Sequence, residues 1–506
     1  MAPRDISNTM DQATEASGGT ASKGCFLRWS RLTKTVAVKD AGAGLMGRSS
    51  ISMSFANAST TIERTTSKDI LKEISGYAAP GEVLACMGPS GSGKTSLMNV
   101  LSGRSSYQGG VISINGVPST QKSMKRLMSK VAYVRQADIF FGHLTVRDQL
   151  TYTALLRMPA EKTTLEKHQE VDKLIRLLRL SKVADSQIMM VSGGEKKRVN
   201  IATELLTDPE VLLLDEPTSG LDSTTAVSLI KLLQEYALQQ GKTVITSIHQ
   251  PSSQVFRSFD RLMMLSDGYV VYFGTPVGSI EYLRTVGLSC PDGYNAADHW
   301  MDLLVVDTGA KEEEEIVDCD EGENTNMQSL LKKRASNPEN DAKAYLKLQN
   351  EWDREAVAEE MDTALVESAD DKSLDGMAMP SEGSKYNSTW TTQYSILVHR
   401  ALKNSRSAIL TPLNLIKSIG LGLATGLIYW QTDYTEQNVQ DIRAYFFFNM
   451  TFWVFDAMFT ALAAFPEERV VIQKERASGS YRLSAYFMAK TTSDMPVRVL
   501  LPLTYM

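Results

Sequence analysis

The sequence has 506 residues, 43% of them hydrophobic and 22% charged, which is an ordinary composition for a globular protein of more than one domain. A net charge of −6 gives no reason to expect nucleic acid as a partner. The four cysteines are scattered and form no Cys-x-x-Cys pair, which favours free thiols in a reducing compartment over a disulfide or zinc framework; they are Cys25, Cys86, Cys290 and Cys319.

The chain begins with a polar tail and then changes to an α/β pattern. Residues 1–24 are rich in Ser, Thr, Gly and Ala, which predicts disorder, and they lack the apolar stretch of a cleavable signal peptide. Residues 26–38 alternate partly between apolar and polar types, as a strand does. A Gly- and Ser-rich interruption runs to about residue 68. Strand and helix patterns then follow one another, and we predict one compact domain over residues 25–305.

The stretch "EVLACMGPSGSGKTSLMNVL" contains a short apolar strand, a glycine-rich loop and the start of a helix. Gly88, four further residues and then Gly93-Lys94-Thr95 give the spacing of a P-loop. Glycine lets backbone N–H groups approach phosphates, Lys94 reaches the outer phosphates, and the Thr95 hydroxyl is a ligand for Mg²⁺. We therefore predict a nucleotide site formed by Gly88, Pro89, Ser90, Gly91, Ser92, Gly93, Lys94, Thr95 and Ser96.

Three later apolar stretches each lead into a polar side chain suited to phosphate chemistry. The strand "VLLLDEP" places Asp215 to hold Mg²⁺ and Glu216 to accept a proton from attacking water. Gln136, in "YVRQADIF", is a candidate ligand for Mg²⁺ and the water, although a lone Gln is most often a surface residue. His249, in "TSIHQPSS", is a candidate contact for the γ-phosphate, although a lone His there is more often structural.

A second candidate anion site lies in "VSGGEKKRVNIATELL", residues 191–206. Small residues at Ser192, Gly193 and Gly194 lead directly into a helix pattern, with Glu195 in its first turn. A helix N-terminus offers free N–H groups and a positive dipole to an anion. The sequence therefore predicts two phosphate cradles about a hundred residues apart.

The chain changes character after the α/β region. Residues 306–384 contain a run with eight acidic residues between Glu312 and Glu323, which is typical of a solvated linker. Residues 385–506 begin with an amphipathic pattern suited to a membrane surface. Two apolar stretches follow at 409–430 and 445–465, each carrying one charge and each long enough for a spanning helix, and a third begins near 491–506. Two buried core helices are the alternative interpretation.

The charges around these stretches favour a multi-pass membrane protein. Basic residues precede the first stretch and follow the second, while the loop between them is acidic, so the α/β domain is expected on the cytoplasmic side. Lys417 lies near one end and is able to snorkel. Asp456 is costly at a helix centre and is expected to face protein or water. With only two complete spans, we expect Asn449 and Asp456 to have too few partners.

The motifs occur in the order and spacing of an ABC-type ATPase: the P-loop, "RQ", "SGGE", "LLLDEPTSGLD" and "SIHQ". The resemblance covers residues 25–305, and "SGYAAPGE", "VSGGEKKR" and "SIHQPSSQVF" resemble the G subfamily of White-type half transporters. The ATPase region precedes the membrane segments, which is the order in that subfamily. Ala296 stands where the family usually has Pro. The resemblance implies an α/β P-loop NTPase, an ABC-type ATPase domain with a helical subdomain, followed by an all-α transmembrane segment.

The resemblance also implies how the site residues work. Two ATPase domains pack head to tail, so that Ser192, Gly193, Gly194 and Glu195 contact ATP bound to the partner's P-loop, with Asp222 across the same interface. The remaining residues act in cis on ATP and Mg²⁺: Lys94, Thr95, Gln136, Asp215, Glu216 and His249. The expected partners are a second half transporter, membrane lipid and a hydrophobic cargo such as a lipid or sterol. Trp29 or Phe55 is the candidate for stacking on adenine.

Two alternatives stay open at this point. A soluble ABC ATPase without transport is one, although such proteins usually carry two ATPase domains or a coiled coil and no membrane spans. A fragment or short isoform is the other, because the family has six spans per chain and only two and a beginning are visible here. On that basis we expect the chain as given to bind ATP, to dimerise poorly and to transport nothing. Neither the cargo nor the membrane is readable from the sequence.

Overall fold

The computed structural model describes residues 24–39, 65–119, 130–291, 293–304, 386–409, 412–430 and 439–505. The chain is divided into two compact units, and each of them is formed by two separate stretches of sequence. The first unit comprises residues 1–133 and 210–377, and the second comprises residues 134–209 and 378–506. Predictions that fall on Phe55, on Cys319 and on the linker 306–384 lie outside the described residues. Cys25, Cys86 and Cys290 are free thiols, as expected.

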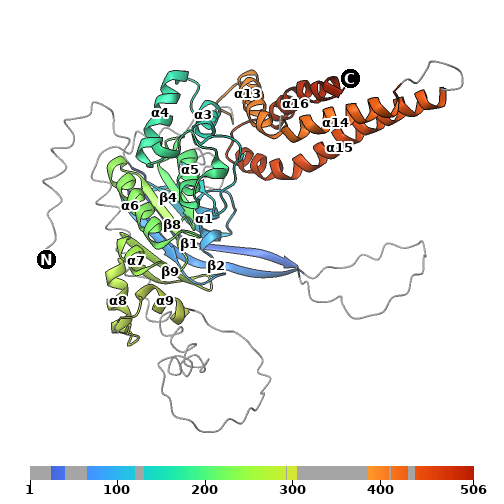
Figure 1. Ribbon diagram of the computed structural model, residues 1–506. Helices are drawn as coiled ribbons and strands as arrows, with labels where there is room; N and C mark the ends of the chain where they lie inside the picture. The colour runs from blue at the N-terminus through green and yellow to red at the C-terminus, as the bar shows by residue number, and fades with distance from the viewer. Residues whose placement is uncertain are drawn as a thin grey trace, which may run out of the picture. The chain divides into compact units, whose positions relative to one another are not determined.

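The first unit contains a six-stranded sheet in the order β10-β9-β3-β8-β7-β6 (Figure 1). Strand β3 pairs in parallel with β8 and β9, β7 pairs in parallel with β8, and β10 returns antiparallel to β9 at the edge. Strands β3, β7 and β8 are buried along their whole length, as continuous apolar runs predict for strands covered on both faces. The bounds are β3 Val83–Met87, β6 Val131–Val134, β7 Val211–Asp215, β8 Thr243–Ser247, β9 Arg261–Ser266 and β10 Tyr269–Gly274.

A second, four-stranded sheet in the same unit has the order β2-β1-β4-β5 and is antiparallel throughout. Strand β1 confirms the strand predicted near residues 26–38. Large apolar side chains from this sheet, Trp29 and Leu32 among them, join the core cluster that also holds Leu213 and Ile245 of the parallel sheet. The bounds are β1 Leu27–Lys39, β2 Thr65–Ala78, β4 Gly109–Ile114 and β5 Val117–Ser119.

The helices of the first unit follow strands of its sheets along the chain (Figure 1). The longest, α6, begins at an Asp222 cap and ends at Gly241, which has the left-handed backbone that commonly closes a helix. The bounds are α1 Lys94–Leu101, α6 Ser223–Gln240, α7 Ser253–Ser258, α8 Pro276–Thr285 and α9 Ala296–Leu304.

The second unit is helical. Three of its helices begin with the same device, a Thr or Ser whose hydroxyl accepts from the backbone three residues on, while an Asp or Glu there accepts in return. These helices are α3 Val146–Arg157, α4 Thr164–Leu177 and α5 Gly193–Leu205. Two short 3-10 turns, Ser181–Val183 and Ile188–Met190, lie between α4 and α5. The remaining helices are α13 Trp390–Ile409, α14 Pro412–Ile428, α15 Val439–Ala477 and α16 Leu483–Tyr505.

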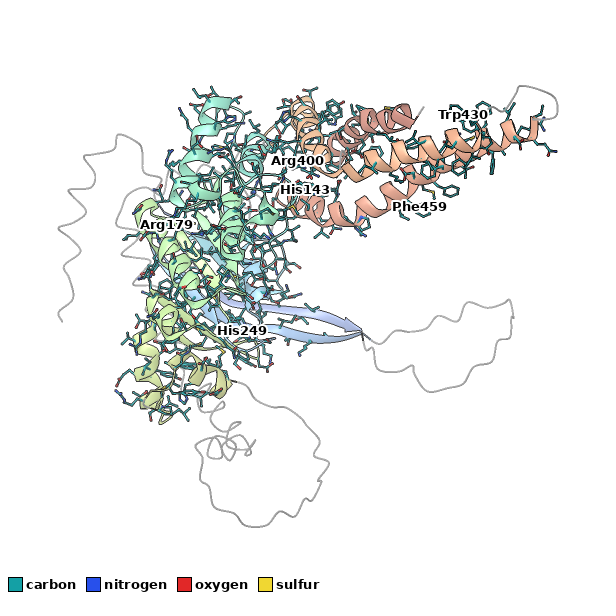
Figure 2. The ribbon with its side chains drawn as sticks, viewed as in Figure 1. His143, Arg179, His249, Arg400, Trp430 and Phe459 are labelled. Carbon is teal, nitrogen blue, oxygen red and sulfur yellow. The ribbon has the colours of Figure 1, made fainter. Side chains whose placement is uncertain are left out.

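Polar contacts join α13 to α3 and to α15. Lys403 Nζ lies 2.7 Å from Asp148 Oδ1 on α3, and the Tyr152 hydroxyl lies 2.8 Å from His399 Nδ1. Arg400 of α13, labelled in Figure 2, is buried and donates to both carboxylate oxygens of Glu475 at 2.8 and 3.0 Å. Such a buried ion pair is stable only because both charged groups are hydrogen-bonded.

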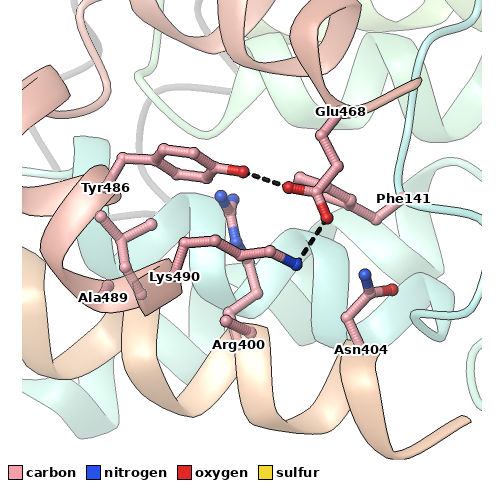
Figure 3. A pocket seen from close by; sticks show the side chains of 9 residues that line it. Phe141, Arg400, Asn404, Glu468, Tyr486, Ala489 and Lys490 are labelled. Carbon is pink, nitrogen blue, oxygen red and sulfur yellow. Dashed lines mark hydrogen bonds and ion pairs between the residues drawn. The ribbon is translucent and has the colours of Figure 1, made fainter. Parts of the chain in front are cut away.

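A small pocket lies beside Arg400, between α13, α15 and α16 (Figure 3). Lys490 Nζ lies 2.8 Å from Glu468 Oε1, and the Tyr486 hydroxyl donates to the other oxygen of the same carboxylate. Glu468 therefore satisfies two donors from α16 and fixes the start of that helix against α15.

One prediction about the two apolar stretches is corrected by the structure. Lys417 of α14 and Asp456 of α15 form an ion pair, so the expectation that Asp456 has too few partners is wrong. The sequence gives no register between the two helices, and it is this register that brings the charges together. Asn449 donates to the Tyr445 carbonyl oxygen at 2.9 Å, while its own Oδ1 is buried without a hydrogen-bond partner in the described structure.

Exposed apolar side chains cover much of α14 and α15, including Ile416, Leu427, Phe447 and Phe459. Trp430, just beyond α14, is exposed too, and Figure 2 labels it together with Phe459. Within the described part of the chain, no helix combines enough length with enough apolar character to cross a membrane.

Candidate functional site

The glycine-rich loop between β3 and α1 has the backbone that its glycines permit. Gly88 has φ 148°, and a Cβ added there would lie 2.0 Å from the Leu265 carbonyl oxygen. Gly93 caps α1 with φ 105°, and a Cβ there would lie 2.9 Å from Leu71 Cδ2. A side chain at either position would clash or strain the turn. The loop is therefore closely packed at both ends.

Between those ends the loop offers groups suited to an anion. Lys94 is 6% exposed, and its Nζ donates to the carbonyl oxygens of Gly88 and Pro89 at 2.7 and 2.9 Å, so the ammonium lies inside the curve of the loop. Ser92 Oγ is buried without a hydrogen-bond partner in the described structure, and Gly91 is exposed with open space around it. Burial lowers the pKa of Lys94, and the nearby carboxylates of Glu216 and Asp215 oppose that shift.

Asp215, at the end of β7, lies at the centre of a hydroxyl cluster. Its Oδ1 accepts from Ser247 Oγ at 2.7 Å and from Thr95 Oγ1 at 3.3 Å, and its Oδ2 accepts from the Tyr133 hydroxyl at 3.0 Å. Asp215 is 7% exposed, whereas Thr95 is exposed. A hydroxyl beside a carboxylate is the kind of oxygen pair that Mg²⁺ takes as ligands. These residues therefore fit the metal predicted from the sequence.

Glu216 follows directly and has an unusual backbone. Its φ is 46°, a left-handed conformation that is uncommon for a residue with a side chain. Its N–H donates to Ser247 Oγ at 2.8 Å, so one serine hydroxyl binds both the Asp215 carboxylate and the Glu216 backbone. Such strain persists only where the surroundings hold the backbone, and it is frequent at functional sites.

The parallel sheet explains why these groups meet. Asp215 pairs in register with Ser247, and Ser247 pairs with Cys86, two residues before the glycine-rich loop. Parallel strands place their carboxyl ends at one edge, where α/β proteins bind ligands. His249, labelled in Figure 2, follows β8 at this edge and is exposed. Burial raises the pKa of Cys86 to about 12, so that thiol stays protonated beside the site.

Sequence reasoning missed Ser247 and Tyr133. Both end or nearly end a buried strand, and Ser247 stands two residues before His249 in "TSIHQ". A polar residue at the carboxyl end of an apolar strand is the signal that singled out Asp215. The same signal, applied to "TVITS", would have found Ser247.

The second predicted cradle lies in the second unit, at the start of α5. Ser192 Oγ accepts from the Glu195 N–H, while Glu195 Oε2 accepts from Ser192 N and Oγ at 2.9 and 2.8 Å. Glu195 is therefore occupied in shaping the helix start. Ser192 and Gly193 are exposed, Gly194 is buried, and a Cβ on Gly193 would meet nothing within 4 Å. The helix start is open at Gly193, as an anion site requires.

The remaining predicted residues are placed as follows. Gln136 is exposed in the second unit, and its carbonyl oxygen accepts from Lys197 Nζ. Asp222 is exposed and caps α6, accepting from the Thr225 N–H at 3.0 Å, and hydrogen bonds from Thr224 and Thr225 hold its pKa well below the usual range. Trp29 is 0% exposed in the core, so the idea that it stacks on adenine is wrong: a residue of an alternating strand faces either core or solvent, and the pattern alone did not decide which.

A glycine-rich phosphate loop after a buried strand, with a hydroxyl-bound carboxylate at the end of another strand of the same parallel sheet, defines a P-loop NTPase. Residues 71–219 match the family described as ABC transporter, and residues 392–506 match the family described as ABC-2 type transporter. The chain belongs to the ABC transporters by both of these domains, and the relatives that it matches are G-family members and White proteins. As a member of a family with a membrane domain, it is a membrane protein.

Relatives match along most of the chain. ABC transporter G family member 22 of Arabidopsis thaliana is 39% identical over 451 residues, which cover 86% of this chain and 58% of the relative. Member 21 from the same plant is 38% identical, covering 86% and 63%. Protein white of Drosophila melanogaster is 34% identical, covering 87% and 61%. The chain therefore spans about three fifths of the length of these relatives. Among solved structures, cbiO1 of Clostridium perfringens, part of an ABC transporter complex, is 24% identical with a TM-score of 0.41, covering 53% of this chain and 96% of the other.

Proposed function

We propose that this chain is an ATP-hydrolysing half transporter that works as a homodimer or heterodimer and moves a hydrophobic substrate, such as a lipid or sterol, across a membrane. The contact between Thr95 and Asp215 at the foot of the glycine-rich loop carries the ATPase part of this proposal. The match of residues 392–506 to an ABC-2 type transporter supports the transport part.

In this proposal the loop backbone and the Lys94 ammonium bind the phosphates of ATP. Thr95 and Asp215 would hold Mg²⁺, which when bound neutralises phosphate charge, and Gln136 is a further candidate ligand. Glu216 accepts the proton of the attacking water. Its strained backbone, held by the hydrogen bond to Ser247, fixes the position from which the side chain extends. His249 contacts the outer phosphate from the same sheet edge.

The second predicted phosphate site, at the start of α5, would serve the dimer. Ser192, Gly193 and Gly194 lie in a different compact unit from the glycine-rich loop. We infer that they contact the ATP of the partner subunit, with Asp222 near the same interface. ATP then holds the two subunits together and hydrolysis releases them, which is a two-state switch able to drive the attached helices.

The basic residues that flank α14 and α15 favour an ATPase region on the cytoplasmic side of a multi-pass protein. Resistance of the full chain to alkaline carbonate extraction tests this membrane assignment. Release of the chain into the carbonate supernatant would favour an ABC ATPase without a transport role.

Replacing Glu216 with Gln tests the hydrolytic assignment. The amide keeps the shape of the side chain and is unable to take a proton, so ATP binding is expected to persist while the hydrolysis rate falls by a factor of about 10² or more. ATP-dependent dimers accumulate as a result. The measurements are nucleotide affinity, steady-state phosphate release and dimer mass.

Glu281→Gln is the matched control, because the side chain of Glu281 is 64% exposed and pairs only locally with Arg284. Its rate is expected to equal that of the wild type. Hydrolysis by Glu216→Gln within a few-fold of the wild-type rate would exclude Glu216 as the base.

A further inference from the structure

A lysine is buried at the end of α15, within the second unit. Lys474 is 8% exposed, and its Nζ donates to the Ile139 carbonyl oxygen at 3.1 Å and to Asn200 Oδ1 at 2.8 Å. The ammonium also lies 4.3 Å from the ring centroid of Phe140. Both hydrogen-bond acceptors are neutral, and burial lowers the pKa of Lys474 to about 8. A charge kept in such a place needs its few partners to be well fixed.

Asn200, the side-chain partner of Lys474, is also held by hydrogen bonds from its amide nitrogen. It is 0% exposed on α5, the helix that Ser192 caps. Its Nδ2 donates to Asp138 Oδ1 at 2.8 Å and approaches the Arg135 carbonyl oxygen at 3.4 Å. Because the amide nitrogen is occupied in this way, the amide oxygen is directed to Lys474.

The same hydrogen bonds continue to Gln136. Lys197 of α5 is 3% exposed, and its Nζ lies 3.4 Å from Asp138 Oδ2 while also donating to the Gln136 carbonyl oxygen. A continuous chain of polar contacts therefore runs from Lys474 through Asn200, Asp138 and Lys197 to the backbone of Gln136. Three of its links involve the segment 135–139, which has no helix or strand to hold it.

The cavity beside Lys474 is too small for another side chain to replace its ammonium group. A cavity of about 20 Å³ adjoins Lys474 and is lined by Gln149, Thr153 and Glu204 among others. Gln149 Oε1 is buried without a hydrogen-bond partner in the described structure. The cavity has room for one water molecule and not for a further side chain. Loss of the ammonium would leave Asn200 Oδ1 and the Ile139 carbonyl oxygen without their charged donor.

We propose that Lys474 is a positioning residue that fixes the segment 135–141, and with it Gln136, from the end of α15. This inference rests on the proposed function, in which Gln136 serves Mg²⁺ and the attacking water. It makes the placement of Gln136 dependent on the helix that also carries Asp456. A change in α15 thereby reaches Gln136 through side chains of a single compact unit.

The test compares variants of the full-length dimer by hydrogen–deuterium exchange and by ATPase rate as a function of Mg²⁺ concentration. In Lys474→Met, amide exchange in segment 135–141 is expected to rise at least about fivefold, and half-maximal activity to need about five- to tenfold more Mg²⁺. Lys474→Arg, which keeps the charged donor, restores both values. Adding Gln136→Ala to Lys474→Met is expected to cause little further loss, because both changes remove the same function.

Lys167→Met is the matched control. Lys167 is also 8% exposed in the second unit, but it donates to the Met158 carbonyl oxygen and has no link to Gln136. This control is expected to change the unfolding temperature without changing exchange in 135–141 or the Mg²⁺ requirement. If Lys474→Met does not fold, Asn200→Asp carries the test, because it removes the donor to Asp138 and breaks the chain one link later.

Unchanged exchange in 135–141 and an unchanged Mg²⁺ requirement, in a wild-type background that hydrolyses ATP, would overturn this proposal and leave the proposed function intact. Losses that multiply in the Gln136→Ala/Lys474→Met double variant would also overturn it. Absence of Mg²⁺-dependent hydrolysis in the wild-type dimer would instead overturn the proposed function and, with it, this inference.

Discussion

At the scale of single residues, the candidate site depends on how Asp215 is held. The carboxylate is 7% exposed and accepts hydrogen bonds from three hydroxyl groups, on Thr95, Ser247 and Tyr133. Hydrogen bonds to a charged group are the strong ones, and a buried carboxylate without them is costly. Ser247 has two functions here, because its oxygen also accepts from the N–H of Glu216.

Ser247→Ala is therefore expected to disturb the metal site more than its size suggests. Hydrogen bonds to charged groups contribute about 1.5–3 kcal/mol, so the Mg²⁺ concentration for half-maximal hydrolysis is expected to rise about tenfold or more. Titration of ATPase activity with Mg²⁺ measures this shift. Ser266→Ala is the control, since Ser266 also ends a buried parallel strand and its hydroxyl bonds to the Leu304 carbonyl oxygen. Equal Mg²⁺ requirements for the two variants would contradict the role given to Ser247.

At the scale of elements, α14 and α15 are joined by the ion pair of Lys417 and Asp456. The Lys417 ammonium also lies 5.4 Å from the ring centroid of Phe452 on α15. An isolated Asp or Lys at the centre of a spanning helix costs about 2.5–3.5 kcal/mol on insertion scales. Pairing the two charges lowers that cost, so the two helices are expected to enter a membrane together.

Lys417→Met is expected to leave Asp456 without its cation and to lower the fraction of chain that resists carbonate extraction. The double variant Lys417→Met/Asp456→Leu removes both charges, and we expect it to restore the wild-type fraction or exceed it. Lys403→Met, which removes a lysine of α13 that pairs with Asp148 of α3, is the control. If both single and double variants insert like the wild type, the pair has no part in insertion.

At the scale of the whole molecule, the two predicted phosphate cradles belong to different compact units. The glycine-rich loop lies in the first unit and the Ser192 cap in the second. In a head-to-tail dimer each composite site would take one cradle from each subunit. A site shared between subunits and a site complete within one subunit therefore predict different behaviour of mixed dimers.

Complementation tests the shared site. A Lys94→Ala chain and a Gly193→Asp chain each damage a different half of every site, so either homodimer is expected to be inactive. A mixed dimer keeps one of its two equivalent sites, and its ATPase rate is expected to reach at most about half that of the wild type. Tagged co-purification establishes that mixed dimers form. Mixed dimers as inactive as the homodimers would contradict the trans assignment.

The sequence by itself determined the local features. The P-loop could be predicted because glycine spacing, an apolar strand before it and a helix pattern after it are all properties of adjacent residues. The strand that leads to Asp215 could be predicted because a continuous apolar run indicates a parallel strand buried on both faces. The cap at Ser192 follows from Glu195 three positions later, since both groups belong to one helical turn.

Only the tertiary structure decided which distant side chains meet. Ser247 reaches Asp215 through strand register, and Lys417 reaches Asp456 through helix packing, and neither register is written in local spacing. Trp29 is a candidate for adenine stacking by sequence and a core residue in the structure, because an alternating strand does not say which face is the core. No local sequence pattern predicts that Lys474 is buried. Its partner Asn200 is 274 residues away, and a lysine near a helix end is normally expected to be exposed to solvent.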